Sequence, residues 1–189
     1  MISFVFGLVT FLALHSISII NRPWRDRMVA SWGEPVWKGG YSLVSLAAFV
    51  LMCYGYGLTR ADPAVLYQPP STLRHLAMAL LLPVFPLMLA VYLPGRIKAA
   101  AKHPLLLATK CWALAHLLAN GALADVLLFG GFLVWAVADR IAVKRRPQTV
   151  VVIGPNAVRN DVIAVVGGLT MYAVFVFWLH RALIGVAPV

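Results

Sequence analysis

The sequence predicts an all-α protein that spans a membrane as a bundle of about six helices. Of its 189 residues, 62% are hydrophobic and 12% are charged, whereas a soluble domain has roughly 25% charged residues. The charges are also segregated, because long apolar stretches alternate with short basic ones. An apolar stretch of about 20 residues is long enough for a helix to cross the hydrocarbon core.

Six segments satisfy this requirement and are expected to be the membrane helices. They are residues 2–20, 41–59, 73–93, 104–121, 123–142 and 161–181. Pro83 and Pro86 should kink the third segment, because each proline removes a backbone donor. Asn160 or Asp161 is the expected N-cap of the sixth. Residues 1–189 are expected to form one membrane domain.

The distribution of basic residues predicts the orientation of the helices. Segments 21–40, 94–110 and 140–160 hold thirteen of the sixteen lysines and arginines. The positive-inside rule places these segments in the cytoplasm and both termini on the non-cytoplasmic side. The same bias accounts for the net charge of +10 without a nucleic-acid partner, for which no recognition motif is present.

Two of the basic segments have features beyond a simple connection. Residues 21–40 contain three tryptophans and a Gly-Glu-Pro break, which is typical of a segment at the level of the lipid headgroups. Residues 149–153 form a short apolar run, Thr-Val-Val-Val-Ile, that cannot cross a membrane. This run is either a re-entrant or lid element or an ordinary loop with packed valines.

Two of the five histidines lie inside predicted membrane helices and are the first candidates for a functional site. Ionisable side chains are rare in hydrocarbon and usually face a bundle interior or a cavity. A helical rise of about 1.5 Å per residue puts His15 about 8 Å and His116 about 18 Å from the cytoplasmic side. The structural alternative is that each forms an interhelical hydrogen bond.

The other three histidines lie near predicted helix ends, where structural roles are simpler to explain. His103 precedes a proline at a helix start, where a polar residue caps the orphan amides. His180 is next to an arginine at a helix end and is typical of an interfacial residue. His75 lies at the start of the third segment, and both a structural and a functional role remain open for it.

A pair of histidines suits few metal cofactors. Zinc usually takes four ligands, and no such cluster is visible in the sequence. Haem needs only one or two axial ligands and an apolar pocket, and without a Cys-x-x-Cys-His motif it would be haem b. Spacing alone leaves His116 and His103 as alternative candidates for the second haem ligand beside His15. Arg22 and Lys102 are basic residues near the cytoplasmic ends that could contact the haem propionates.

Three stretches of the sequence resemble the NnrU family, which is similar to the zeta-carotene isomerase of plastids and cyanobacteria. They are LHSISIINRPWRD, KHPLLLATKCWALAHLLANG and GGFLVWAVADRIAVKRR. The resemblance implies a bundle of about six membrane helices and a haem b held by His15 and His116. His103 and His75 are further candidates for an alternative ligand or for the surroundings of the iron. The isomerase has a cysteine three residues before the second ligand, where this chain has Ala113.

The resemblance implies a haem-dependent function in a multi-pass protein of the bacterial inner membrane. NnrU proteins are associated with denitrification and nitric-oxide metabolism. The isomerase catalyses cis–trans isomerisation of a polyene, so its substrate is an apolar small molecule. The chain would therefore be a redox enzyme or an isomerase, and the resemblance leaves its oligomeric state open.

Two other functions are compatible with the sequence. The first is a non-catalytic membrane assembly or partner protein. The second is a methyltransferase-like membrane enzyme, because Lys102-His103-Pro104 resembles the Arg-His-Pro-x-Tyr-x-Gly motif of isoprenylcysteine-type methyltransferases. The tyrosine and glycine of that motif are absent from this chain.

Overall fold

The computed structural model describes residues 1–147 and 153–188. Regular structure in these residues is helical, apart from one isolated antiparallel bridge between Val65 and Ala122. The prediction of an all-α protein is therefore confirmed. Contacts within the chain define two compact units. Unit 1 comprises residues 1–68 and 120–146, and unit 2 comprises residues 69–119 and 147–189.

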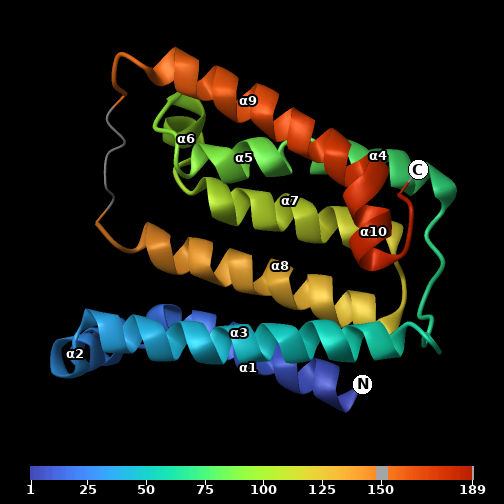
Figure 1. Ribbon diagram of the computed structural model, residues 1–189, viewed down its shortest axis with the longest axis horizontal. Coiled ribbons are helices and arrows are strands. Elements are labelled where there is room, and N and C mark those ends of the chain that lie inside the picture. The colour runs from blue at the N-terminus through green and yellow to red at the C-terminus, as the bar shows by residue number, and fades with distance from the viewer. Residues whose placement is uncertain (148–152, 189) are drawn as a thin grey trace. The chain divides into compact units, whose positions relative to one another are not determined.

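Unit 1 is built around the first helix of the chain. Its helices are α1 (Ile2–Ile20), α2 (Arg22–Trp32), α3 (Glu34–Thr59) and α8 (Leu123–Lys144). Helix α1 packs against both α3 and α8, and the short α2 contacts α1 and α3 (Figure 1). The buried core of this unit consists of Phe4, Leu8, Met52 and Ala124. These residues come from α1, α3 and α8, so the core joins all three long helices.

Two glycines bring the backbones of α1 and α3 close together. A Cβ added at Gly7 would lie 2.5 Å from the backbone nitrogen of Met52, and one at Gly55 would lie 2.3 Å from that of Phe4. Helices in membranes commonly pack through small residues in this way, because apolar lipid gives no hydrophobic drive for association. The α1–α3 contact therefore depends on the absence of side chains at both positions.

The second membrane helix begins earlier than the sequence predicts. Helix α3 starts at Glu34 and not near residue 41, so the predicted interfacial segment 21–40 divides between α2 and α3. Gly33, with φ +82°, ends α2. Pro35 then stands in the first turn of α3, where a missing N–H costs nothing. The break therefore falls at the Gly-Glu-Pro sequence, as predicted, while Gly39 and Gly40 lie within α3.

Unit 2 is a bundle of shorter helices. They are α4 (Ser71–Leu81), α5 (Val84–Ala90), α6 (Arg96–Ala101), α7 (Pro104–Ala119), α9 (Ala157–Val174) and α10 (His180–Ile184), with the π-helical turn η1 (Phe175–Leu179) between the last two. Helix α5 packs against α7 and α9, and α4 packs against α7 (Figure 1). Val84, Leu87 and Ala108 form its buried cluster.

The predicted proline kink is present in unit 2. Helix α4 ends at Leu81 and α5 begins at Val84, directly after Pro83. Pro86 lies in α5 against the backbone of α9, since a Cβ added at Gly168 would be 2.3 Å from the Pro86 nitrogen. The close approach of α5 and α9 therefore requires a glycine at residue 168.

The predicted N-cap of the sixth membrane helix is wrong. Helix α9 begins at Ala157, with Asn156 in the N-cap position. Asp161 instead accepts hydrogen bonds from the backbone N–H groups of Arg96 and Ile97, at 3.0 and 3.1 Å. Its carboxylate satisfies the first amides of α6, which have no partner within that helix. The polar residues that resembled a cap join two distant segments of unit 2.

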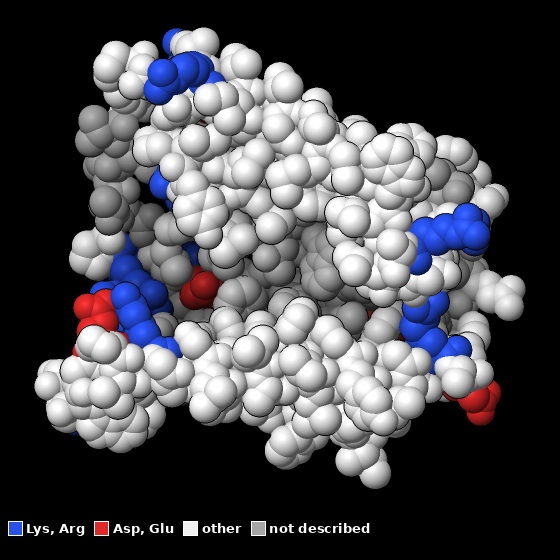
Figure 2. Space-filling model, viewed as in Figure 1, with Lys and Arg blue, Asp and Glu red and all other residues white. Residues whose placement is uncertain are grey.

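Five helical segments in the described residues are long and apolar enough to cross a membrane. They are Ile2–Ile20, Glu34–Thr59, Ser71–Ala90, Leu123–Lys144 and Ala157–Ile184. Figure 2 shows the exposed face of α3 as an uncharged surface with charged side chains at its two ends. The predicted span 104–121 forms α7, which is apolar but has 16 residues.

The structure supports the prediction of a membrane protein built from helices. The orientation of the termini stays a prediction. The re-entrant or lid interpretation concerns residues 149–153, of which 149–152 lie outside the described part of the chain.

Candidate functional site

His15 lies in the second half of α1, which ends at Ile20. Its Nδ1 is 2.8 Å from the carbonyl oxygen of Phe11, one turn earlier in the same helix. Because a carbonyl oxygen only accepts hydrogen bonds, Nδ1 carries the proton and donates this bond. In the neutral ring the lone pair is then on Nε2, which is the nitrogen available to a metal.

Aromatic side chains from three helices of unit 1 surround the His15 ring. Phe11 of α1 stacks on it, with ring centroids 4.1 Å apart and planes 26° from parallel. Tyr41 of α3 and Trp135 of α8 approach edge-on, with centroids 5.4 and 6.2 Å from that of His15. The half-buried His15 ring is therefore oriented by tertiary packing as well as by its own hydrogen bond.

His116 lies in α7 of unit 2 and has the same local arrangement as His15. Its Nδ1 is 2.8 Å from the carbonyl oxygen of Trp112, again one turn earlier. The lone pair of the neutral ring is therefore on Nε2 here too. The Trp112 ring is 5.4 Å from the His116 ring, centroid to centroid, and packs against the buried cluster of unit 2. The Nδ1 hydrogen bond and the Trp112 ring both help to orient His116.

His103 occupies the position before α7, as its expected capping role requires. Its carbonyl oxygen accepts a hydrogen bond from the N–H of Leu107, 3.2 Å away. Its own N–H donates to the carbonyl oxygen of Ala101 at 2.6 Å, which closes a tight turn around Lys102. Lys102 has φ +59° and ψ −48°, a conformation that is strained for a residue with a side chain.

The two remaining histidines lie towards the ends of helical segments. His75 is exposed on α4. His180 begins α10, where its Nδ1 is 2.6 Å from the carbonyl oxygen of Val186. Like His15 and His116, His180 therefore donates from Nδ1, but it does so to the C-terminal turn and not to its own helix.

The two residues predicted to contact haem propionates are both on the surface. Arg22 is exposed, and its Nε lies 3.5 Å from the carboxylate of Asp26, one turn along α2. Lys102 is exposed at the strained turn between α6 and α7.

Two buried donors that the sequence did not single out lie on α8. The Nε1 of Trp135 and the Nη1 of Arg140 are buried and have no hydrogen-bond partner among the described residues. Arg140 was assigned to the cytoplasmic segment 140–160, but α8 continues to Lys144. A basic residue inside the last turns of an apolar helix is the signal that identifies it.

The donor set fits a haem better than an isolated metal ion. Among residues 1–147 and 153–188, no group of three or more His, Cys, Asp or Glu side chains is placed to hold a metal. A porphyrin brings four nitrogens of its own, so the protein has to supply only one or two axial ligands. A histidine with a fixed Nδ1 proton meets that requirement, and each unit has one in the middle or second half of an apolar helix.

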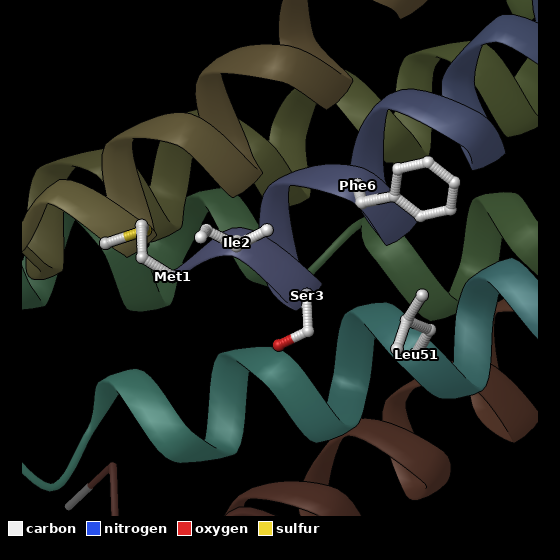
Figure 3. Close-up of a pocket in the computed structure, with 5 residues that line it drawn as sticks. All are labelled: Met1, Ile2, Ser3, Phe6 and Leu51. Atoms are coloured by element: carbon white, nitrogen blue, oxygen red, sulfur yellow. The ribbon is translucent and has the colours of Figure 1, made fainter.

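An open groove on the surface of unit 1 is separate from His15. It is lined by Met1, Ile2, Ser3, Phe6 and Leu51, which come from the start of α1 and from α3 (Figure 3). His15 is thirteen residues further along α1 than Ile2, which corresponds to about 20 Å. The groove is almost entirely apolar, as expected for a surface that faces lipid.

Comparison with known proteins identifies the family. The model of a family described as NnrU protein matches residues 3–188. The chain belongs to the NnrU family. The match covers both units and includes His15 and His116. No curated protein and no solved structure matches the chain.

Proposed function

We propose that this NnrU protein binds haem b, with His15 and His116 as the axial ligands of the iron. The observation that carries the proposal is the hydrogen bond from Nδ1 of each ring to the carbonyl oxygen four residues earlier. Metal-binding histidines almost always donate from their second nitrogen in this way, because the bond fixes the tautomer and raises the basicity of the ligating nitrogen.

The surroundings of each ring support the same proposal. Three aromatic side chains contact His15, and the indole of Trp112 contacts His116. Flat apolar groups are the usual lining of a haem pocket in a helix bundle. In the neutral form of each ring, the Nδ1 hydrogen bond leaves the lone pair on Nε2.

The proposed role is redox chemistry or nitric-oxide handling at the membrane. When bound, haem b supplies an iron that can change its oxidation state and exchange an axial ligand. The thiol that precedes the second ligand in the related isomerase is replaced by Ala113, which is fully buried. The nearby Cys111 packs against the cluster of Val84, Leu87 and Ala108. These positions favour a redox or nitric-oxide role over polyene isomerisation.

The test is the absorption spectrum of the full-length protein, produced with ample haem and purified in detergent. The expected result is a Soret band, a b-type pyridine haemochrome and a low-spin ferric spectrum typical of two histidine ligands. His15→Ala and His116→Ala should each lose the low-spin signal or the haem. Added imidazole should restore the low-spin signal in any variant that keeps the haem.

Two matched controls separate ligation from general damage. His180→Ala removes a histidine that also donates from Nδ1, and His75→Ala removes an exposed one. Both variants should keep the wild-type spectrum. A colourless wild-type protein, or a low-spin spectrum that survives both His15→Ala and His116→Ala, would overturn the proposal. Loss of the low-spin signal in His103→Ala but not in His116→Ala would assign the second ligand to His103.

A further inference from the structure

Arg140 is a half-buried cation whose Nη1 atom is fully buried. That atom has no hydrogen-bond partner among the described residues. The ion pairs found in these residues involve Arg22, Arg25 and Lys38. Buried polar atoms are normally hydrogen-bonded, because leaving one without a partner costs free energy. The Nη1 of Arg140 is therefore placed to donate to an acceptor outside the described residues.

A second donor on the same helix is also without a partner. The Nε1 of Trp135 is buried and makes no hydrogen bond within the described residues. An indole N–H can only donate, so Trp135 and Arg140 need the same kind of ligand, one that carries acceptor oxygens. Trp135 also lies edge-on to the His15 ring, with their planes 85° apart and their centroids at 6.2 Å. One of the two donors is therefore next to the candidate ligand of unit 1, and the other follows it on α8.

Arg140 lies nearer to the end of α8 than the residues that contact His15. The ring contacts Phe11–Phe132 and His15–Trp135 set the register of α1 against α8. Nη2 of Arg146 donates to the carbonyl oxygen of Ser18, which brings the end of α8 next to the end of α1. Arg140 is five residues beyond Trp135, so a rise of about 1.5 Å per residue puts it about 7 to 8 Å nearer to that end of unit 1.

We infer that Arg140 and Trp135 hold a propionate of the haem whose iron binds His15. This inference rests on the proposed function. A haem propionate is an oxyanion attached to a flat apolar body, so it offers acceptors to the buried donors while the ring lies among the aromatic side chains. Guanidinium groups bind carboxylates through short, charge-assisted hydrogen bonds. Arg140 and Trp135 take the role first predicted for the exposed Arg22 and Lys102.

The phosphate of a membrane lipid is also an oxyanion that accepts hydrogen bonds. It differs from a haem propionate because it is not attached to a flat apolar ring. A lipid phosphate resides at the headgroup level, where exposed basic side chains reach it. The Nη1 of Arg140 is instead buried, and the indole of Trp135 lies beside the His15 ring. These features favour the propionate.

The test compares haem with its dimethyl ester, which lacks both propionate charges. Full-length protein produced without haem is titrated in detergent with each compound, and the Soret band reports binding. Wild type should bind haem about tenfold more tightly than the ester, because one charge-assisted hydrogen bond contributes on this scale. Arg140→Ala should weaken haem binding by about tenfold and leave ester binding unchanged. Trp135→Phe removes the indole N–H and keeps an aromatic ring. It should reduce the preference for haem over the ester by less than Arg140→Ala does.

Arg145→Ala is the matched control, because Arg145 is exposed just beyond α8. This variant should keep the full preference for haem over the ester. Equal weakening of haem and ester in Arg140→Ala, or an unchanged preference in that variant, would overturn the inference while the haem proposal stands. Loss of tightly bound phospholipid from Arg140→Ala with an unchanged preference would assign the site to lipid and also overturn it. A wild-type protein that binds neither compound would instead refute the proposed function.

Discussion

The candidate histidines of unit 1 and unit 2 share one kind of hydrogen bond and differ in the aromatic rings that contact them. Both donate from Nδ1 to the carbonyl oxygen four residues earlier. Side chains from α1, α3 and α8 contact the His15 ring, so its orientation depends on the packing of three helices. The indole of Trp112, one turn earlier in α7, contacts the His116 ring and links it to the buried cluster of unit 2.

The helix contacts that support each site also differ. In unit 1, Gly7 and Gly55 lie at the contact between α1 and α3. In unit 2, Gly168 of α9 lies against Pro86 of α5. A disturbance of the α1–α3 contact should therefore reach His15 through its neighbours. A disturbance of the α5–α9 contact should reach His116 only through α5 and α7.

The largest expected effects follow from adding a methyl group at these glycines. Gly55→Ala and Gly168→Ala would each bring a Cβ to 2.3 Å from a backbone nitrogen of the neighbouring helix. Since backbone cannot move aside as a side chain can, each change should destabilise the fold by about 3 kcal/mol. The free energy of unfolding in mixed micelles of detergent and SDS measures this loss.

Paired variants sharpen the comparison between the units. Gly7→Ala combined with Gly55→Ala should cost less than the sum of the single changes, because both act on one contact. Gly55→Ala combined with Gly168→Ala should be additive. Gly57→Ala is the control, because a Cβ there meets nothing within 4 Å, and it should stabilise the helix by roughly 0.5–1 kcal/mol. Equal destabilisation by Gly57→Ala and Gly55→Ala would contradict the steric explanation.

The next largest effect is expected for Asp161 in unit 2. Asp161→Ala removes the acceptor of two backbone N–H groups at the start of α6. Because those amides would lose their partners, we expect a loss of about 2 kcal/mol. Asp161→Asn keeps one acceptor oxygen and should lose about half as much. Thermal unfolding in detergent measures both, and equal melting temperatures for the two variants would contradict this order.

A smaller effect is expected for a hydrogen bond in unit 1. The hydroxyl of Tyr56 donates to Oδ1 of Asp125, while Oδ2 accepts from the N–H of Ala122. Tyr56→Phe removes one of these bonds and keeps the ring that packs against Phe4. We expect a loss of about 1 kcal/mol in thermal unfolding. Tyr54→Phe changes an exposed tyrosine and should leave the stability unchanged.

The sequence predicts the elements of this fold better than their connections. Apolar length is a local property, so the five long spans and the kink at Pro83 can be predicted from it. The break at Gly33 could also be predicted, but α3 begins directly after it and not near residue 41, because the polar first turns of the helix carry no apolar signal. The partner of Asp161 could not be predicted, since it lies 65 residues earlier in the chain.

The candidate site shows the same division between local and distant information. The Nδ1 bond of a helical histidine to the carbonyl four residues earlier is local, and a histidine inside an apolar span indicates where to look for it. The position of Tyr41 and Trp135 around His15 depends on how α3 and α8 pack against α1. Arg140 was missed because it was counted with the basic segment 140–160, although the predicted span 123–142 also contained it, and the burial of its Nη1 depends on tertiary packing.

The smallest expected effect is a gain in stability at the turn before α7. Lys102 has φ +59° in the turn that His103 and Ala101 close, and such strain costs about 1–3 kcal/mol for a residue with a Cβ. Glycine adopts this conformation without strain but loses roughly 0.5–1 kcal/mol more backbone entropy on folding. Lys102→Gly should therefore raise the stability by about 1 kcal/mol, measured by thermal unfolding.

The sign of that change is the informative result. Ala100→Gly, in the neighbouring helix α6, should lower the stability by roughly 0.5–1 kcal/mol because no strain is relieved there. A loss of stability in both variants would show that the turn at Lys102 is unstrained. A gain in Lys102→Gly together with a changed Soret band would go further. It would show that the turn before α7 affects His116, which lies on that helix.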